Sequence, residues 1–289
     1  MKLTDQQRPL PSPSVPASGE GGFSLLELIV SSVILMIVVG VAVNYIAVAT
    51  QRSKVEQTKV DLTQEGRAFV DEFERDIHQA GYPGCAVFNT GGNCSAHLND
   101  GTMAAGLVLV SNTQIILEGD ADGDGVVDSI QYRLVDSAGN FPPTESCPCT
   151  VQRSQVAKVA GTAPTAQATN FSQELQNVVN SGVPPAGSVY GGGLPIAGNV
   201  LFAGGSSNDA YYAAVSTFKD SPLISVFDQN GSVIALPVDD TTLAGQMALA
   251  NIKSVRLTIN LLGSGTSGYD IKNGVRPVVT LVGNGRRNN

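Results

Sequence analysis

The sequence lacks the motifs on which common enzyme mechanisms depend. It has no tryptophan and only two histidines, and it contains neither a His-Glu-x-x-His zinc motif nor a Gly-x-Ser-x-Gly nucleophile motif. The glycine-rich segment 263–268 is not followed by a lysine, so a phosphate-binding loop is not expected there. We therefore predict that the protein is not an enzyme.

Basic residues are also scarce. Lys and Arg number 17 against 25 Asp and Glu, which gives a net charge of -8. A chain of this sign repels the phosphate backbone, so no nucleic-acid partner is indicated. With 42% hydrophobic residues and 32 glycines, the composition is typical of one loop-rich globular domain joined to an apolar segment.

Long apolar runs are absent except for one, which extends from Phe23 to Ala49 without Asp, Lys or Arg. It exceeds the roughly 20 residues that a helix needs to cross a bilayer. Glu27 is its single charged residue, and a carboxylate in a membrane span costs roughly 2.5 to 3.5 kcal/mol on insertion scales, so a partner is expected. If the chain were cut after Gly22, the new amino group of Phe23 would lie one helical turn from Glu27.

The sequence Gly-Phe-Ser-Leu-Leu-Glu-Leu that starts at Gly22 resembles the type IV prepilin motif of type IV pilins and type II secretion pseudopilins. In that family a membrane peptidase cuts after the glycine, here Gly22, and the new N-terminal residue, here Phe23, is N-methylated. In the same family the glutamate, here Glu27, helps to dock subunits into a filament. An ordinary membrane anchor or a secretory signal peptide would not explain Glu27.

The resemblance implies a division of the chain. Residues 1–22 are expected to form a cytoplasmic leader that is cleaved off, and residues 23–50 the transmembrane and filament-core helix. Residues 51–82 are expected to be the amphipathic half of the same helix, because apolar residues recur there at three-, four- and seven-residue spacings. The residues of this stripe are Leu62, Phe69, Phe73, Ile77 and Ala80.

The end of this helix narrows the resemblance. Residues 75–85 read Arg-Asp-Ile-His-Gln-Ala-Gly-Tyr-Pro-Gly-Cys. This looks like PilW-type minor pilins, in which an Arg-Asp-Ile element runs into Ala-Gly-Tyr and then Gly-Cys. J-type pseudopilins of type II secretion systems share the Arg-Asp element and are the alternative within the same structural class.

Residues 83–289 are predicted to be a β-rich globular head. Short runs rich in β-branched residues are separated by Gly, Asn, Asp and Pro, and residues 228–231 give a hairpin signal. Residues 161–222 are expected to be a loop-rich insertion, and residues 241–250 a short helix. The predicted fold class is α+β and pilin-like, a long N-terminal helix packed on an antiparallel sheet. The predicted strands are 107–110, 114–117, 129–135, 223–227, 232–236, 252–262 and 275–282.

An acidic loop between two of these strands predicts a Ca²⁺ site. Carboxylates recur at positions 1, 3, 5 and 9 of the loop, and Gly125 allows the tight turn that an oxygen cage requires. Gln131 stands where an EF-hand has a bidentate glutamate, so the loop is more like the Asp-rich loops between strands of extracellular proteins. The alternative is a solvated acidic turn. The predicted ligands are Asp120, Asp122, Asp124, Asp128 and the Val126 carbonyl.

The cysteines are interpreted as disulfide candidates. They are Cys85, Cys94, Cys147 and Cys149, and all follow the apolar run, on the side where an oxidising compartment is expected. Bridges 85–94 with 147–149, or two crossed bridges, both remain open. A zinc site is the poorer interpretation because the spacing lacks two paired ligand sets.

The resemblance implies a PilW-like minor pilin that inserts into the bacterial inner membrane by a single helix, with its head outside the cytoplasm, and is then found in the pilus at the cell surface. The expected partners are other pilin subunits, the prepilin peptidase and methyltransferase, and the inner-membrane assembly machinery. One alternative is a pseudopilin of a type II secretion system. An alternative of another class is an unprocessed, membrane-anchored calcium-binding or adhesive module.

Overall fold

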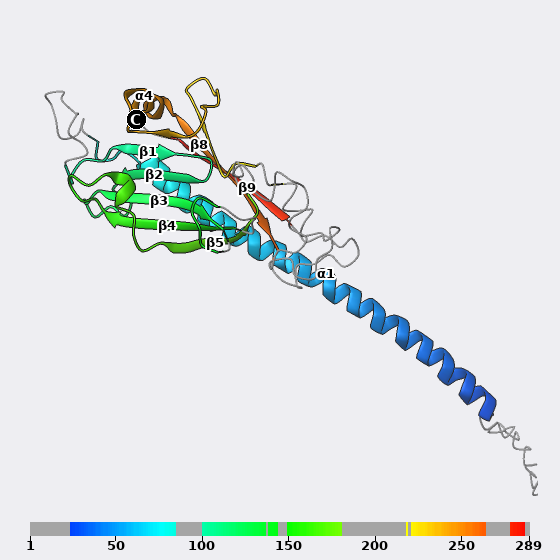
Figure 1. Ribbon diagram of the computed structural model, residues 1–289. Helices are drawn as coiled ribbons and strands as arrows, with labels where there is room; N and C mark the ends of the chain where they lie inside the picture. The colour runs from blue at the N-terminus through cyan, green and yellow to red at the C-terminus, as the bar shows by residue number, and fades with distance from the viewer. Residues whose placement is uncertain are drawn as a thin grey trace, which may run out of the picture. The chain divides into compact units, whose positions relative to one another are not determined.

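The computed structural model describes residues 24–84, 100–136, 138–143, 149–180, 218, 221–263 and 278–286. The chain divides into two compact units, residues 1–49 and residues 50–289. Helix α1 spans Leu25–Gln79 (Figure 1), and the predicted long N-terminal helix is thereby confirmed.

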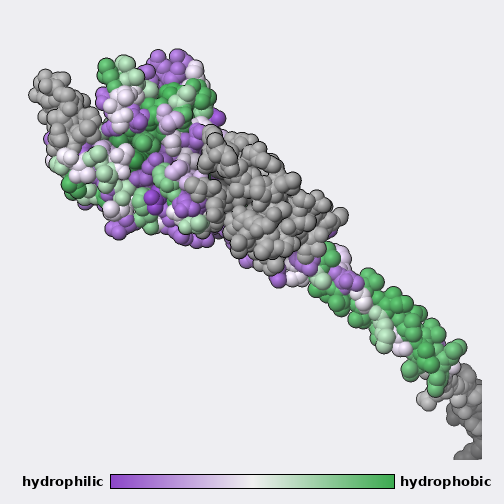
Figure 2. Space-filling model, viewed as in Figure 1, coloured by the Kyte–Doolittle hydropathy of each residue, from purple (hydrophilic) through white to green (hydrophobic). Residues whose placement is uncertain are grey.

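In the first unit, α1 begins after Ser24, whose backbone carbonyl accepts a hydrogen bond from the amide of Leu28. The side chains that follow are apolar and exposed, and Figure 2 shows them as a run of hydrophobic surface. The hydroxyls of Ser31 and Ser32 donate to carbonyls of the preceding turn, so they are satisfied within the helix. By length and composition this helix can cross a membrane.

The second unit contains an antiparallel sheet whose strands run in the order β6-β8-β5-β4-β3-β2-β1-β7, with β9 also paired to β8 (Figure 1). The register is continuous along β2, β3 and β4, whereas β5 joins β8 at the single pair Val178–Leu261. The bounds are β1 Gly106–Val110, β2 Gln114–Gly119, β3 Asp128–Val135, β4 Cys149–Ala157, β5 Ser172–Val178, β6 Ile224–Phe227, β7 Val238–Asp239, β8 Ser254–Leu262 and β9 Val278–Arg286, with the 3-10 turn η2 Pro164–Ala166 and helix α4 Leu243–Asn251.

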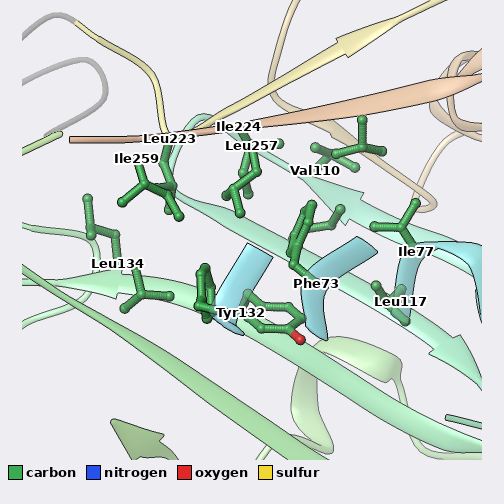
Figure 3. Close-up of a cluster of buried hydrophobic side chains, with 14 of the residues drawn as sticks. Phe73, Ile77, Val110, Leu117, Tyr132, Leu134, Leu223, Ile224, Leu257 and Ile259 are labelled. Atoms are coloured by element: carbon green, nitrogen blue, oxygen red, sulfur yellow. The ribbon is translucent and has the colours of Figure 1, made fainter. Parts of the chain in front are cut away.

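The second half of α1 packs its apolar stripe against this sheet. All five residues of the predicted stripe are buried, which confirms the amphipathic pattern. The ring of Tyr132 on β3 makes edge contacts with Phe69 and Phe73, at centroid distances of 5.7 and 5.3 Å. Figure 3 shows Phe73, Ile77 and Tyr132 in one cluster with side chains of the strands.

Strand β9 approaches α1 closely because glycines line the contact. A Cβ atom on Gly285 would lie 2.6 Å from the Cβ of Ile77, and one on Gly283 would lie 2.6 Å from a methyl of Val70. The carboxylate of Glu74 accepts a hydrogen bond from the backbone amide of Asn284 at 2.7 Å. The last described strand is therefore fixed to the helix by both packing and polar contacts.

The strand predictions for 107–110, 114–117, 129–135, 223–227 and 252–262 agree with β1, β2, β3, β6 and β8, and the prediction for 275–282 overlaps β9. The short helix near 241–250 agrees with α4. The run 232–236 is not a strand. The turn at Asp228 forms as predicted, but afterwards only Val233 bridges back to Phe227, because the chain then leaves to pair as β7 with β1. Strand β5 and turn η2 fall inside the segment expected to be a loop-rich insertion.

Candidate functional site

The predicted processing site lies outside the described residues, since these begin at Ser24 and the site is at Gly22 and Phe23. Glu27 lies in the first turn of α1, and its side chain is exposed. A carboxylate at a helix N-terminus is favoured by the helix dipole, and at this position it can also accept hydrogen bonds from a second chain.

The acidic loop joins β2 to β3 and brings three carboxylates together. One oxygen of each of Asp120, Asp122 and Asp124 lies within 4.8 Å of the other two, and we call these residues the aspartate cluster. Asp120 is buried, and its two oxygens accept hydrogen bonds from the amides of Gly123 and Gly125 at 2.8 and 3.1 Å. Both glycines have positive φ, 77° and 86°, so the loop turns back twice around Asp120.

The remaining members of the loop continue this pattern. Asp122 accepts from the amide of Asp124 at 3.2 Å, and Asp124 accepts from the amide of Val126 at 2.7 Å. The carboxylates of Asp122 and Asp124 are exposed, so a cation can reach their free oxygens from solvent. Such oxygen ligands suit a hard divalent cation.

Asp128, the fourth predicted acid, is the first residue of β3. Its carboxylate accepts a hydrogen bond from the side chain of Gln155 on β4. Burial raises the pKa of the Asp128 carboxyl, the bond from Gln155 opposes this rise, and the charges of the aspartate cluster add to it. The structure thus groups three of the four acids and places the fourth within their electrostatic reach.

The loop is tied to the end of α1. The amide of Asp120 donates to the carbonyl of Tyr82, and the amide of Gly81 donates to the carbonyl of Glu118, each at 2.8 Å. Between them, Gly119 packs so closely that a Cβ atom would lie 2.5 Å from the Gln79 carbonyl oxygen. The acidic loop and the helix terminus therefore form one structural element.

A buried polar network, not predicted from the sequence, joins α1 to two strands. The fully buried carboxylate of Asp76 accepts a hydrogen bond from the Tyr132 hydroxyl at 2.6 Å and from the Arg153 guanidinium at 2.8 Å. Burial and the neighbouring Asp76 carboxylate raise the pKa of the Tyr132 phenol, so Tyr132 remains a neutral donor. Asp76 and Arg153 are 77 residues apart in the sequence, so the pattern of neighbouring residues could not predict this contact.

A second buried ion pair lies beside the acidic loop. The Nζ atom of Lys158 is 2.6 Å from the carboxylate of Glu118 and also donates to the carbonyl of Met103, and both charged side chains are fully buried. The amide of Ala105 donates to the same Glu118 oxygen at 2.9 Å. This cluster holds the segment before β1 against the sheet.

Cys149 is buried at the start of β4 and is disulfide-bonded. The three other cysteines lie outside the described residues, so the predicted choice between pairings stays a prediction. His78 lies exposed in the last turn of α1, and His97 lies outside the described residues.

No family model matches the chain, and neither the curated proteins nor the solved structures contain a match.

Proposed function

We propose that this chain is a structural subunit of a filament, a PilW-like minor pilin that is processed by a prepilin peptidase and assembled into a type IV pilus or primes its assembly. The observation that carries the proposal is the composition of α1. Its first half is apolar and exposed with one carboxylate in the first turn, and its second half buries an apolar stripe against an antiparallel sheet.

The proposed assembly step follows from the charge of Glu27. Cleavage after Gly22 would free the amino group of Phe23, which is positively charged. In an apolar surrounding this charge would neutralise the carboxylate of Glu27. In a filament the exposed apolar faces of neighbouring helices would be buried against one another, while Glu27 would pair with an amino group of an adjacent subunit.

Processing is tested by mass spectrometry of the N-terminus of the protein isolated from membranes. We expect a chain that begins with N-methylated Phe23. A chain that retains Met1 would contradict the prepilin interpretation and favour the unprocessed anchored module.

Docking is tested with Glu27→Ala, compared with Glu56→Ala as a matched control. Glu56 is an exposed carboxylate on the same helix, and within the described part of the chain its ion-pair partner is the exposed Lys59. We expect Glu27→Ala to remain in the membrane fraction but to be lost from sheared filaments, whereas Glu56→Ala enters them normally. Normal incorporation of Glu27→Ala would refute the docking role.

The alternative within the same class is a pseudopilin of a type II secretion system. Cross-linking of the intact cell, followed by identification of the neighbouring subunits, separates the two machines because their partners differ. If only secretion pseudopilins are captured, the chain belongs to a type II secretion system and not to a type IV pilus.

We further propose that the acidic loop binds Ca²⁺ and stiffens the β2–β3 connection. The convergence of the aspartate cluster supports this, and Asp128 and the Val126 carbonyl are the predicted additional ligands. Isothermal titration of the detergent-solubilised chain with Ca²⁺ is expected to give one site, lost in Asp122→Ala/Asp124→Ala and kept in the exposed control Asp71→Ala. If Ca²⁺ produces neither a heat of binding nor a rise in thermal stability, the loop is a solvated turn and the calcium proposal is wrong.

A further inference from the structure

Asn44 is the single carboxamide in the apolar first half of α1, and its side chain is exposed. Apolar residues lie on both sides of it along the helix, and residues 46–49 extend the run beyond it. An amide in an apolar surrounding is unfavourable unless its donor and acceptor are both hydrogen-bonded. In a membrane this requirement is met by a polar group on another helix.

The position of Asn44 within α1 is regular. It belongs to a line of residues with alternating spacings of four and three, which we call the seam. This spacing is that of the a and d positions of a coiled coil, with Val30, Ile37 and Asn44 at the a positions. The seam consists of Leu26, Val30, Val33, Ile37, Gly40, Asn44 and Ala47, all in the helix and all exposed.

We propose that the seam binds a second copy of this chain, parallel and in register, with the two Asn44 side chains hydrogen-bonded to each other. Copies inserted in one membrane have the same orientation, so their Asn44 residues lie at the same depth. A carboxamide is both donor and acceptor, and an identical carboxamide therefore satisfies it. One Asn at an a position of a parallel coiled coil fixes the register of the two helices, and here Val30 and Ile37 occupy the two preceding a positions.

The residues around Asn44 permit the approach that this pairing needs. Gly40 has no heavy atom within 4 Å of the place a Cβ would occupy, and Ala47 is the next member of the seam on the other side. Small residues at such positions let two helix backbones come close. Glu27 lies roughly 100° around the helix from Asn44, at 100° per residue, so pairing along the seam leaves Glu27 accessible to an amino group.

This inference rests on the proposed membrane location of the first half of α1. The test uses full-length chains labelled with donor or acceptor dye and reconstituted together in phosphatidylethanolamine/phosphatidylglycerol vesicles at increasing lipid dilution. Energy transfer reports association, and flotation of the same vesicles reports membrane insertion separately.

Three variants are compared with the original chain. Asn44→Leu keeps the branched shape of the side chain but removes the amide, and it is expected to weaken association by about 3- to 30-fold. Asn44→Gln keeps an amide and is expected to recover most of the association. Ser32→Leu changes a polar residue of the same helix, roughly 120° from Asn44, and is expected to associate as the original chain does.

Equal association of Asn44→Leu and the original chain would overturn the proposal, as would an equal loss in Ser32→Leu. A chain that floats with the vesicles but gives no energy transfer would overturn the seam while leaving the membrane location intact. A chain that does not float would overturn both.

Discussion

The carboxylate of Asp76 is expected to be among the most important polar groups for the stability of the head. It is fully buried and receives the Tyr132 hydroxyl at 2.6 Å and two guanidinium nitrogens of Arg153, at 2.8 and 3.1 Å. Replacement by alanine leaves a guanidinium whose side chain is only 11% exposed without its closest counter-charge. Removing one partner of a buried pair costs about 3 to 5 kcal/mol.

The expected value for Asp76→Ala is near the lower end of that range. Arg153 retains Glu72 at 3.4 Å and the side-chain oxygen of Gln155 at 2.7 Å, so part of its hydrogen bonding survives. We therefore expect a loss of about 3 kcal/mol, a large fraction of the roughly 5 to 15 kcal/mol that stabilises an ordinary domain.

Urea unfolding of the detergent-solubilised chain, followed by circular dichroism, measures this difference. The control is Asp71→Ala, an exposed carboxylate on the same helix, which is expected to change the free energy of unfolding by less than about 0.5 kcal/mol. The double variant Asp76→Leu/Arg153→Met removes both charges and is expected to be more stable than Asp76→Ala. If Asp76→Ala matches the control, the network does not hold the helix on the sheet.

Three further variants test other contacts of α1. Burial raises the pKa of Glu72, so the folded state disfavours the ionised form of this carboxyl. The free energy of unfolding therefore falls as the pH rises through the ordinary carboxyl range. In a pH series of urea midpoints, Glu72→Gln is expected to flatten this part of the curve. Gly119→Ala places a Cβ 2.5 Å from the Gln79 carbonyl oxygen and is expected to lower the free energy of unfolding in urea by about 1 to 3 kcal/mol. Gly101→Ala is its control, because there the new Cβ makes an ordinary contact of 3.7 Å. Phe73→Ala is expected to lose about 3 to 5 kcal/mol in the same assay.

The sequence predicted the elements whose signal is local. The stripe on α1 follows the helical period, and β1, β2, β3 and β8 are short runs of β-branched and apolar residues, so each could be located without knowledge of its neighbours. The tight acidic loop was also predicted, because aspartate and glycine at fixed offsets determine its turns locally.

Strands β4 and β5 were not predicted, since their sequences are largely polar. In β5 only Leu175 and Val178 are fully buried, and the strand is recognisable only from its pairing with β4 and β8. The polar network of Asp76, Tyr132 and Arg153 was missed for a related reason. Its members are brought together by the packing of α1 on β3 and β4, and a residue's own neighbours in sequence carry no information on that packing.

The two halves of α1 satisfy their polar groups in different ways. In the second half, Asp76 and Glu74 are hydrogen-bonded by the sheet of the same chain, through Arg153 and the amide of Asn284. In the first half, Glu27 and Asn44 are exposed on a helix whose other side chains are almost all apolar. In a membrane or a packed filament those two groups require partners, and each offers a different chemistry, a charge and a neutral amide. Loss of assembly in Glu27→Ala with retained pairing, and loss of pairing in Asn44→Leu with a retained processed N-terminus, would establish that one helix carries two separable contacts.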